Sequence, residues 1–345
     1  MNKFQTVQWG IIGCARIAAT AMIPGIKGSA NGDVLAIVSR EQEKAKAYAG
    51  KFDIPRAYGS YEALLDDPEI QAVYVPLPNS LHKEWTIKAA KKGKHVLCEK
   101  PIACCAAHAQ EMNAACRENG VLLMEAFAQR FHPQYQKAQA LIQEGRIGRI
   151  LRISAAMSRS PHPADDIRMN PSLCGGALMD LGCYCINTAR HLVGSEPVSV
   201  FATQDIGPSG VDERTTGTLC FHGGEILQFD THLYLEDKHF EQGCTVHGEK
   251  GNIYIPQAFS QVEILRFGRM VESALFITDH RIGDHQTERI SIEAVHQWQL
   301  ELEFFADRVL TERSIESPGE NGVANMRAID AVVQSAQTGV PVELS

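Results

Sequence analysis

Three polar side chains in two short segments have the types and the spacing needed to move protons. Asp180 and Tyr184 are four residues apart in the segment 175–184, GGALMDLGCY, so they share one face of a predicted helix. Lys100 lies in the segment 95–101, HVLCEKP, directly after an apolar run. A phenol with an ordinary pKa of about 10 is a poor base near neutrality, and a neighbouring ammonium group lowers that pKa. The set predicts general acid–base chemistry, although a solvated helix face and an ordinary strand exit would use the same residues.

The position of Lys100 is set by the residues on both sides of it. The apolar run before it predicts a buried parallel strand, and open α/β sheets bind ligands at the carboxyl ends of such strands. Pro101 restricts Lys100 to an extended backbone and is compatible with a cis peptide bond, which would direct the lysine side chain. We therefore expect Lys100 at the ligand-binding edge of a sheet.

The first predicted strand ends in a turn suited to a diphosphate. Residues 10–18 read GIIGCARIA, and Gly13, Ala15 and Ala18 occupy the three positions of the G-x-G-x-x-G/A pattern, with alanine in place of the second glycine. The turn opens a helix, whose free backbone N–H groups and dipole favour an anion. We expect a dinucleotide here; a tight turn without a ligand is the alternative.

The end of the second predicted strand distinguishes between two dinucleotides. It reads Val38-Ser39-Arg40, at the place where an NAD site has an acid that accepts the ribose hydroxyls. A hydroxyl followed by a guanidinium suits a 2′-phosphate, which a carboxylate would repel. The sequence therefore predicts NADP(H) in preference to NAD(H), unless Arg40 is only a solvated side chain at the end of a strand.

The elements that position these residues alternate regularly in residues 1–126. Predicted strands lie at 7–12, 34–39, 72–77, 95–98 and 122–127, and predicted helices lie at 16–26, 41–51, 80–92 and 105–119. Apolar strands alternating with helices predict an α/β domain, a doubly wound parallel sheet of the Rossmann type that binds a dinucleotide.

The pattern changes in residues 127–345. Predicted helices lie at 134–144, 177–192, 294–312 and 321–338, and a strand begins within 147–158. Further strands are predicted at 197–206, 215–221, 225–235, 240–247, 252–256 and 262–267. We expect a C-terminal α+β domain with a large, mostly antiparallel open sheet, which binds the substrate and forms the dimer contact.

Composition excludes several classes of protein. The chain has 345 residues, a formal net charge of −8 and no basic block, which argues against nucleic acid as a partner. No apolar run approaches the roughly 20 residues that span a bilayer, and the first residues enter a strand at once, so we expect no membrane segment and no signal peptide. The ten cysteines lack the spacing of a metal site. We therefore expect no metal and reduced thiols, Cys104 and Cys105 among them as packing residues, in a cytoplasmic protein.

Several segments occur together in a recognisable order. They are WGIIGCARIA (9–18), the Ser39-Arg40 pair, VYVPLPNSLH (73–82), CEKP (98–101), MEAFAQRFHP (124–133), GGALMDLGCY (175–184) and VHGEKGNI (246–253). Together they resemble the glucose–fructose oxidoreductase, inositol dehydrogenase and MocA (Gfo/Idh/MocA) family over essentially the whole chain. The resemblance is strongest to its dimeric dihydrodiol dehydrogenase and NADP-linked xylose dehydrogenase branch.

The resemblance implies roles for individual residues. Lys100 lies where the family's Glu-Lys-Pro lysine is near nicotinamide and substrate, and Asp180 takes the position of a substrate-facing aspartate. Tyr184 falls where many relatives have a catalytic histidine, and a tyrosine there resembles the glucose–fructose oxidoreductase and dihydrodiol dehydrogenase branch. Lys100, Tyr184 and Asp180 are therefore the expected catalytic residues.

The resemblance also implies a set of residues that bind the cofactor. Asn79 and His82 match the family's Pro-x-Asn-x-x-His segment beside the cofactor, and Arg168 lies in a stretch that is near the nicotinamide half in relatives. The whole expected set is Gly10, Gly13, Ala15, Arg16, Ile17, Ser39, Arg40, Leu77, Asn79, His82, Glu99, Lys100 and Arg168.

The implied activity is hydride transfer between NADP(H) and a CH–OH or C=O group of a sugar, a sugar derivative or a vicinal diol, with Tyr184 as proton relay assisted by Lys100. A homodimer is implied because relatives pair the open sheet face with a second subunit. Strands such as 226–235, ILQFDTHLYL, would otherwise leave apolar side chains exposed. A non-catalytic dinucleotide-binding regulator and a sugar–sugar oxidoreductase with a tightly bound cofactor remain alternatives. Specificity is expected in the loop 157–174 and in sheet residues such as His232 or Tyr234.

The predicted helix 294–312 carries several carboxylates. Glu301, Glu303 and Asp307 fall at spacings that place carboxylates along the predicted helix 294–312. Charged residues at such spacings are typical of a surface, so we interpret them as a solvated helix face.

Overall fold

The computed structural model describes residues 6–236, 239–261, 264, 268–281, 286–311 and 318–344. The chain forms two compact units. The first comprises residues 1–128, 262–269 and 296–323, and the second comprises residues 129–261, 270–295 and 324–345. The predicted strand 262–267 lies outside the described residues except for Ile264.

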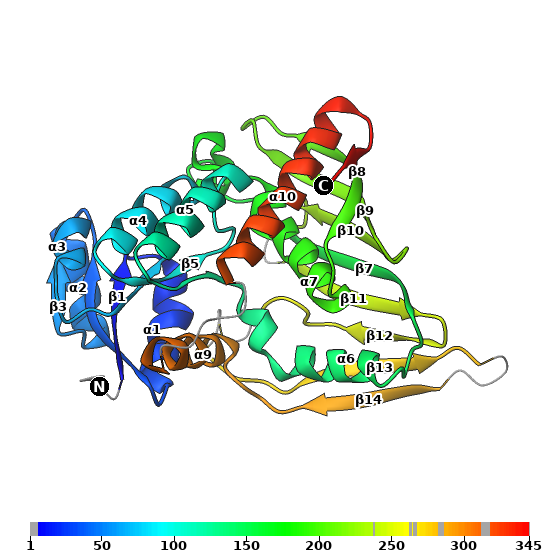
Figure 1. The fold of residues 1–345 in the computed structure, drawn as a ribbon, viewed down its shortest axis with the longest axis horizontal. Coiled ribbons are helices and arrows are strands. Elements are labelled where there is room, and N and C mark those ends of the chain that lie inside the picture. Colours follow the sequence, from blue (N-terminus) through cyan, green and yellow to red (C-terminus); the bar gives the residue numbers. More distant parts are fainter. Residues whose placement is uncertain are drawn as a thin grey trace. The chain divides into compact units, whose positions relative to one another are not determined.

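A parallel sheet forms the centre of the first unit. Its strands are β1 (Val7–Ile12), β2 (Gly32–Val38), β3 (Arg56–Tyr58), β4 (Ala72–Val75), β5 (His95–Glu99) and β6 (Leu123–Ala126). They lie in the order β3-β2-β1-β4-β5-β6, and every pair is parallel (Figure 1). All residues of β4 and β6 are buried, as expected when helices cover both faces. The predicted Rossmann sheet is confirmed, with β3 as an additional strand.

The helices of the first unit connect these strands. They are η1 (Ala18–Met22), α1 (Ile23–Gly28), α2 (Gln42–Phe52), α3 (Tyr61–Leu65), α4 (Asn79–Lys91), α5 (Ala106–Glu118) and α9 (Gln297–Thr311). Helix α9 packs on the sheet, with the Phe305 ring 5.5 Å from that of Trp9 in β1. Glu301 shares the face of α9 that carries Trp298 and Phe305, and it is fully buried. The prediction of a solvated face is therefore wrong for Glu301.

The second unit contains a large open sheet. Its strands are β7 (Ile150–Arg159), β8 (Pro197–Ile206), β9 (Asp212–Phe221), β10 (Ile226–His232), β11 (Phe240–Gly248), β12 (Gly251–Ile255), β13 (Ser273–Asp279), β14 (Thr287–Ile292) and β15 (Val342–Glu343). The order is β14-β13-β12-β11-β7-β10-β9-β8-β15. Among the described strands of this second sheet only β7 and β10 pair in parallel, which confirms the mostly antiparallel prediction.

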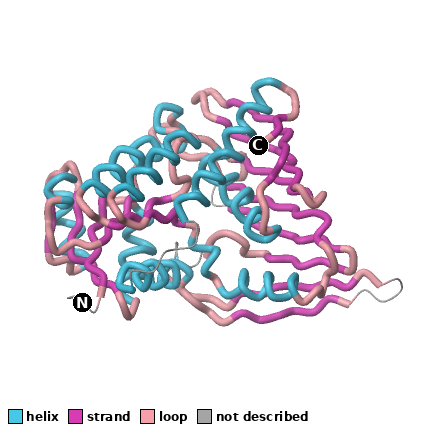
Figure 2. The backbone as a smooth tube through the Cα atoms, in the orientation of Figure 1, coloured by secondary structure: helices cyan, strands magenta, loops and turns pink. Residues whose placement is uncertain are grey.

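Helices cover one face of this sheet. Helix α6 (Pro133–Gln143) packs on β13, and α7 (Cys183–Val193) packs on β7 and β10 (Figures 1 and 2). The end of α10 (Pro318–Thr338) reaches β8, where the Ala202 N–H donates to Ser335 Oγ at 3.1 Å. These contacts bury the core side of each strand.

The other face of the sheet carries polar residues along β10 and exposed aromatic residues on other strands, Phe201 in β8 and Tyr254 in β12. Along β10 the apolar Leu227 and Phe229 are buried, whereas Gln228, Asp230 and His232 alternate with them and are more exposed. The expectation that the segment 226–235 exposes apolar side chains is therefore wrong for Leu227 and Phe229, whereas Tyr234 is 50% exposed. The alternation sends Leu227 and Phe229 to the helix-covered side.

Three further observations concern membranes, metals and thiols. Within the described residues no helix is long and apolar enough to cross a bilayer, and no cluster of three or more His, Cys, Asp or Glu side chains could hold a metal ion. Eight of the ten cysteines are free thiols, most of them buried. Cys104 and Cys174 are disulfide-bonded, so the expectation of reduced thiols is wrong for these two.

Candidate active site

The turn after β1 has the geometry of a diphosphate site. Gly13 has φ +116°, a conformation that favours glycine, and its N–H donates to the Val38 carbonyl at 3.0 Å. A Cβ atom on Gly13 would lie 3.1 Å from Leu77 Cδ2, in the loop that follows β4. Strands β1 and β4 are neighbours at the point where the strand order reverses, which is where doubly wound sheets bind nucleotides. The predicted residues Gly13 and Leu77 are thus brought together at this point.

The rest of the predicted turn is divided between core and surface. Gly10 lies inside β1, where a Cβ atom would come within 2.8 Å of Leu64 Cδ2, so it makes room for packing. Ala15 and Ile17 are half-buried, and Arg16 is exposed at the first helical position. The backbone N–H groups of this helix start are suited to an anion.

The end of β2 combines a buried hydroxyl with an exposed guanidinium. Ser39 is buried, and its Oγ accepts the Glu41 N–H at 3.2 Å. Arg40 is exposed beside it. The Arg40 guanidinium also interacts with the Tyr61 phenol, so a cationic side chain lies next to the buried Ser39 hydroxyl at the end of β2.

Backbone hydrogen bonds fix the loop that carries Lys100. The Lys100–Pro101 peptide bond is cis, as the sequence suggested. The Lys100 N–H donates to Glu99 Oε2 at 3.2 Å, and the Tyr74 hydroxyl donates to the other oxygen of Glu99. Glu125 in β6 accepts the Ile102 N–H at 2.8 Å. Glu99 is therefore part of the support of this loop.

His82 connects this loop with the loop after β4. Its Nδ1 lies 3.0 Å from the Pro101 carbonyl oxygen and its Nε2 lies 2.8 Å from that of Leu77. The ring is buried, and burial lowers its pKa, an effect that the carbonyls oppose and the Lys100 charge reinforces. Both ring nitrogens face carbonyl oxygens, and the neutral ring donates its one N–H to one of them, so the ring links the two loops. Asn79, the first residue of α4, is half-buried at the same edge.

Asp180 and Tyr184 lie on one continuous helix, as predicted. A π-helical turn, η5 (Leu178–Gly182), leads directly into α7, which Gly194 ends in a left-handed conformation. Gly176 precedes the helix with φ +110° and donates its N–H to the Arg168 carbonyl at 2.8 Å. Tyr184 is half-buried, and its ring centroid lies 6.0 Å from that of Phe259.

Positively charged side chains surround the Asp180 carboxylate, which is 8% exposed. Arg168 Nε lies 3.0 Å from Asp180 Oδ1, and Arg159 Nη1 lies 3.4 Å from Oδ2. His162 Nε2 is 3.9 Å from the same Oδ2. The Asp180 charge raises the pKa of the Arg168 guanidinium further above its ordinary range. Arg168, expected at the cofactor, is thus directly paired with Asp180.

A second carboxylate completes this cluster. Asp166 accepts hydrogen bonds from the Arg168 backbone N–H at 2.9 Å and from Arg168 Nη1 at 3.2 Å, and His162 Nδ1 lies 3.4 Å from it. Burial alone would raise the pKa of Asp166, but His162 and Arg168 hold it below its ordinary range. The sequence motifs did not identify Arg159, His162 and Asp166 as site residues. The concentration of charged residues in the loop 157–174 was the one feature of the sequence that pointed to them.

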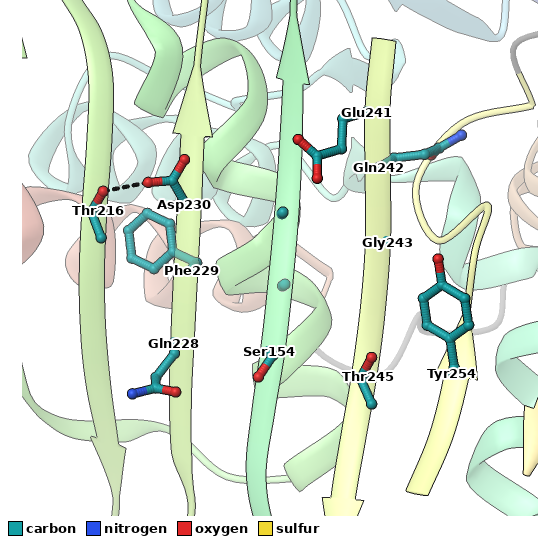
Figure 3. A pocket seen from close by; sticks show the side chains of 12 residues that line it. Ser154, Thr216, Gln228, Phe229, Asp230, Glu241, Gln242, Gly243, Thr245 and Tyr254 are labelled. Atoms are coloured by element: carbon teal, nitrogen blue, oxygen red, sulfur yellow. Dashed lines mark hydrogen bonds between the residues drawn. The ribbon is translucent and has the colours of Figure 1, made fainter. Parts of the chain in front are cut away.

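A shallow hollow on the open face of the sheet is a separate feature. Figure 3 shows it between β9, β10, β7, β11 and β12, with Asp230, Glu241 and Tyr254 among the residues that line it. None of the predicted site residues lines this hollow. The chemistry therefore has to be sought at the sheet edge of the first unit and at the α7 helix of the second.

A parallel sheet in the order 3-2-1-4-5-6 with a glycine turn at its reversal point defines a dinucleotide-binding protein of the Rossmann class. Comparison with known proteins specifies the class further. Residues 7–127 match the model described as "Oxidoreductase family, NAD-binding Rossmann fold", and residues 135–254 match the GFO/IDH/MocA C-terminal domain. The chain belongs to the Gfo/Idh/MocA family of oxidoreductases, and its cofactor is a nicotinamide dinucleotide.

Individual relatives match over nearly the whole chain. The D-xylose 1-dehydrogenase (NADP(+)) 2 of Haloferax volcanii is 36% identical over 98% of this chain and 100% of its own length. The aldose–aldose oxidoreductase of Caulobacter crescentus, solved with glycerol, has a TM-score of 0.87 and 28% identity, covering 98% of this chain and 100% of that one. The 3-ketoreductase KijD10 of Actinomadura kijaniata, solved with NADP and TDP-benzene, has a TM-score of 0.87 and 29% identity, covering 96% and 98%.

Proposed function

We propose that this protein is an NADP(H)-dependent dehydrogenase or reductase that acts on a CH–OH or C=O group of a sugar, a sugar derivative or a vicinal diol. The observation that carries the proposal is the pair Asp180 and Tyr184 on one helix, with Asp180 anchored by Arg168 at 3.0 Å. An anchored carboxylate binds hydroxyl groups, and a phenol one helical turn away can exchange their protons. The names of the Haloferax and Actinomadura relatives support both cofactor and substrate class.

Each side chain has a distinct part in the proposed reaction. A bound nicotinamide supplies hydride acceptance or donation. The Tyr184 phenolate takes the proton of the substrate hydroxyl during oxidation and becomes the phenol, and the phenol gives that proton to the carbonyl oxygen during reduction. The Lys100 ammonium favours the phenolate form of Tyr184. Asp180 orients the substrate by accepting a hydrogen bond from a neighbouring hydroxyl, since its charge is already balanced by Arg159 and Arg168.

We assign the cofactor to residues 1–126 and the substrate to residues 127–345. Gly13, Leu77 and Asn79 would approach the dinucleotide, and Ser39 and Arg40 would bind the 2′-phosphate. A homodimer through the open sheet face is part of the proposal, by analogy with the family rather than from the polarity of that face. Sedimentation tests it, and a monomer at micromolar concentration would refute it.

Binding of the two cofactors is the first test. Purified protein, checked for copurified nucleotide, is titrated with NADPH and with NADH by fluorescence. We expect tighter binding of NADPH, and in Arg40→Ala we expect about tenfold weaker NADPH binding with NADH unaffected, because a charge-assisted hydrogen bond is lost. Lys46→Ala is the matched control, since Lys46 is an exposed cation on α2 that pairs with Glu43. Equal affinities for both cofactors would refute the NADP preference.

Turnover assays follow with aldoses, sugar ketones and cyclic diols. Reversible NADP-linked turnover supports the proposal. The Caulobacter neighbour favours one second candidate, a sugar–sugar oxidoreductase with a retained cofactor. Nucleotide that copurifies, does not exchange and turns over only when two sugars are present would select that candidate. Cofactor binding without turnover of any carbohydrate or diol would instead favour a regulator.

A further inference from the structure

We propose that Asp212 is a positioning residue that holds the start of the helix carrying Asp180 and Tyr184. Asp212 is the first residue of β9, and it contacts that helix through its side chain. The inference rests on the proposed function only for the consequence that it has for turnover. The contact itself is a property of the fold.

Asp212 caps the helix from a neighbouring strand. Its Oδ2 accepts the backbone N–H of Leu178, the first residue of η5, at 2.7 Å. The same oxygen accepts the hydroxyl of Thr215 at 2.6 Å, which fixes the carboxylate on its own strand. The first N–H groups of a helix have no partner within the helix, and the residue preceding η5 is Ala177, which has no side-chain acceptor. Asp212 supplies the missing acceptor two residues before Asp180.

The glycine before the helix is shaped around this carboxylate. A Cβ atom on Gly176 would come within 1.9 Å of Asp212 Oδ1, so only glycine leaves room for the side chain. The Gly176 carbonyl accepts the Asp180 N–H at 3.0 Å, and the Gly176 N–H donates to the Arg168 carbonyl. Because Arg168 also binds the Asp180 carboxylate, Asp212 and Arg168 together fix both the backbone and the side chain of Asp180.

Hydrogen bonds to Asp212 offset part of the cost of burying its charge. The carboxyl is 8% exposed, and burial raises its pKa to about 6, while Thr215, the Leu178 N–H and its own backbone N–H oppose that rise. The negative charge of Asp212 also interacts electrostatically with the exposed phenol of Tyr234. A helix N-terminus favours an anion, so the carboxylate stays ionised at neutral pH and strengthens the bond to Leu178.

Removal of the carboxylate should loosen the helix start and slow the reaction. In Asp212→Ala we expect kcat to fall about tenfold while the KM for NADPH stays within about twofold, because the change affects Asp180 and Tyr184. Amide hydrogen exchange in the segment 175–184 should become about tenfold faster. Asp212→Asn should retain most of the wild-type kcat and most of the wild-type protection from exchange, since its Oδ1 can accept the same two hydrogen bonds.

Asp230 provides the matched control on the adjacent strand. Asp230 accepts the Thr216 hydroxyl at 2.5 Å, a bond drawn in Figure 3, and Arg214 Nη2 at 2.8 Å, so these hydrogen bonds go to β9 and not to the start of the helix. Asp230→Ala should leave kcat and the exchange of segment 175–184 unchanged. An equal change in this control would overturn the proposal, because it would make the effect a general property of the sheet.

The remaining outcomes are equally decisive. Wild-type kcat and wild-type exchange in Asp212→Ala would overturn the proposal, as would Asp212→Asn behaving like Asp212→Ala. If Asp212→Ala does not fold, Asp212→Ser replaces it, because its shorter side chain cannot reach Leu178. If the wild-type protein turns over no sugar or diol, the proposed function fails, whereas the exchange measurement still decides the role of Asp212.

Discussion

The two regions that carry the proposed chemistry are held in place by different means. Around Lys100 several contacts join side chains to backbone groups, such as the carbonyl oxygens that His82 contacts at 2.8 and 3.0 Å, and the Glu99 carboxylate also accepts from the Tyr74 hydroxyl. Around Asp180 they join charged side chains, with Arg168 and Arg159 on its two oxygens. Hydrogen bonds to the backbone respond little to salt, whereas ion pairs that are partly exposed weaken as salt is added. The Lys100 loop should therefore respond less to salt than the Asp180 helix does.

The largest effect is expected from the phenol of Tyr184. Tyr184→Phe keeps the ring beside Phe259 and removes only the hydroxyl, so kcat should fall by about 10² or more, the usual contribution of general acid–base catalysis. Steady-state kinetics with NADPH binding measured in parallel checks this. Tyr135→Phe is a suitable control, since Tyr135 is a buried tyrosine whose hydroxyl donates to the Ala258 carbonyl at 2.7 Å. Near-normal turnover in Tyr184→Phe would remove Tyr184 from the proton relay.

The next effect concerns stability and its pH dependence at Asp212. Burial raises the pKa of this carboxyl from 3.8 to about 6. The buried charge therefore lowers the free energy of unfolding by its full amount above about pH 6, and it has no effect below about pH 4, where the carboxyl is protonated in both states. Asp212→Asn cannot ionise. Its free energy of unfolding, relative to wild type, should therefore rise by roughly 2–3 kcal/mol between pH 4 and pH 8. Urea unfolding at a series of pH values measures this difference, and parallel curves for the two proteins would contradict it.

Much of the fold could be predicted because its strands are apolar and regularly spaced. Segments 7–12 and 197–206 match β1 and β8 in full. Two of the elements that were missed, β3 and β14, carry weak patterns, whereas β13 was missed although it reads SALFITD and contains an apolar run. β3 has only three half-buried residues, and β14 is an edge strand whose side chains are largely exposed. Neither shows the alternation or the apolar run that identifies a strand from sequence.

The candidate site was predictable where its residues share one local element. The spacing of Asp180 and Tyr184 placed them on one helix face, and the apolar run before Lys100 placed it at a sheet edge. Contacts made across the fold gave no local signal. Asp212 is 34 residues from Leu178 along the chain, and only the packing of η5 against β9 brings them together.

A smaller effect should separate the buried charge network from a surface ion pair. Arg168→Met leaves Asp166 and Asp180 without their shared partner, and we expect a loss of about 2 kcal/mol in the free energy of unfolding. Arg214→Met breaks the Arg214–Asp230 pair, in which the Arg214 side chain is 47% exposed, and should cost at most about 1 kcal/mol. Urea unfolding at low and high salt compares them. Equal losses in the two variants would show that the network around Asp180 gives no special stability.

The smallest effect is expected at the Lys100 loop. His82→Asn leaves the Leu77 and Pro101 carbonyls without the ring nitrogens, and turnover should fall about tenfold through loss of loop position. His95→Asn is the control, since His95 accepts the Leu122 N–H at 3.0 Å at the amino end of β5 and should change stability but not kcat.

Acid should act on the two regions in opposite directions. Burial lowers the pKa of His82 below 6.5, so the folded state resists protonation of this ring, and the stability that the neutral ring provides is lost as the pH falls below about 6.5. Protonation of Asp212 instead removes the unfavourable free energy of its buried charge, so it raises the free energy of unfolding as the pH falls from about 6 to about 4. His82→Asn should therefore reduce the acid sensitivity of unfolding, whereas Asp212→Asn should increase it. Urea unfolding of the double variant beside both single variants tests this opposition, and additive changes are expected because the two side chains share no contact partner among the described residues.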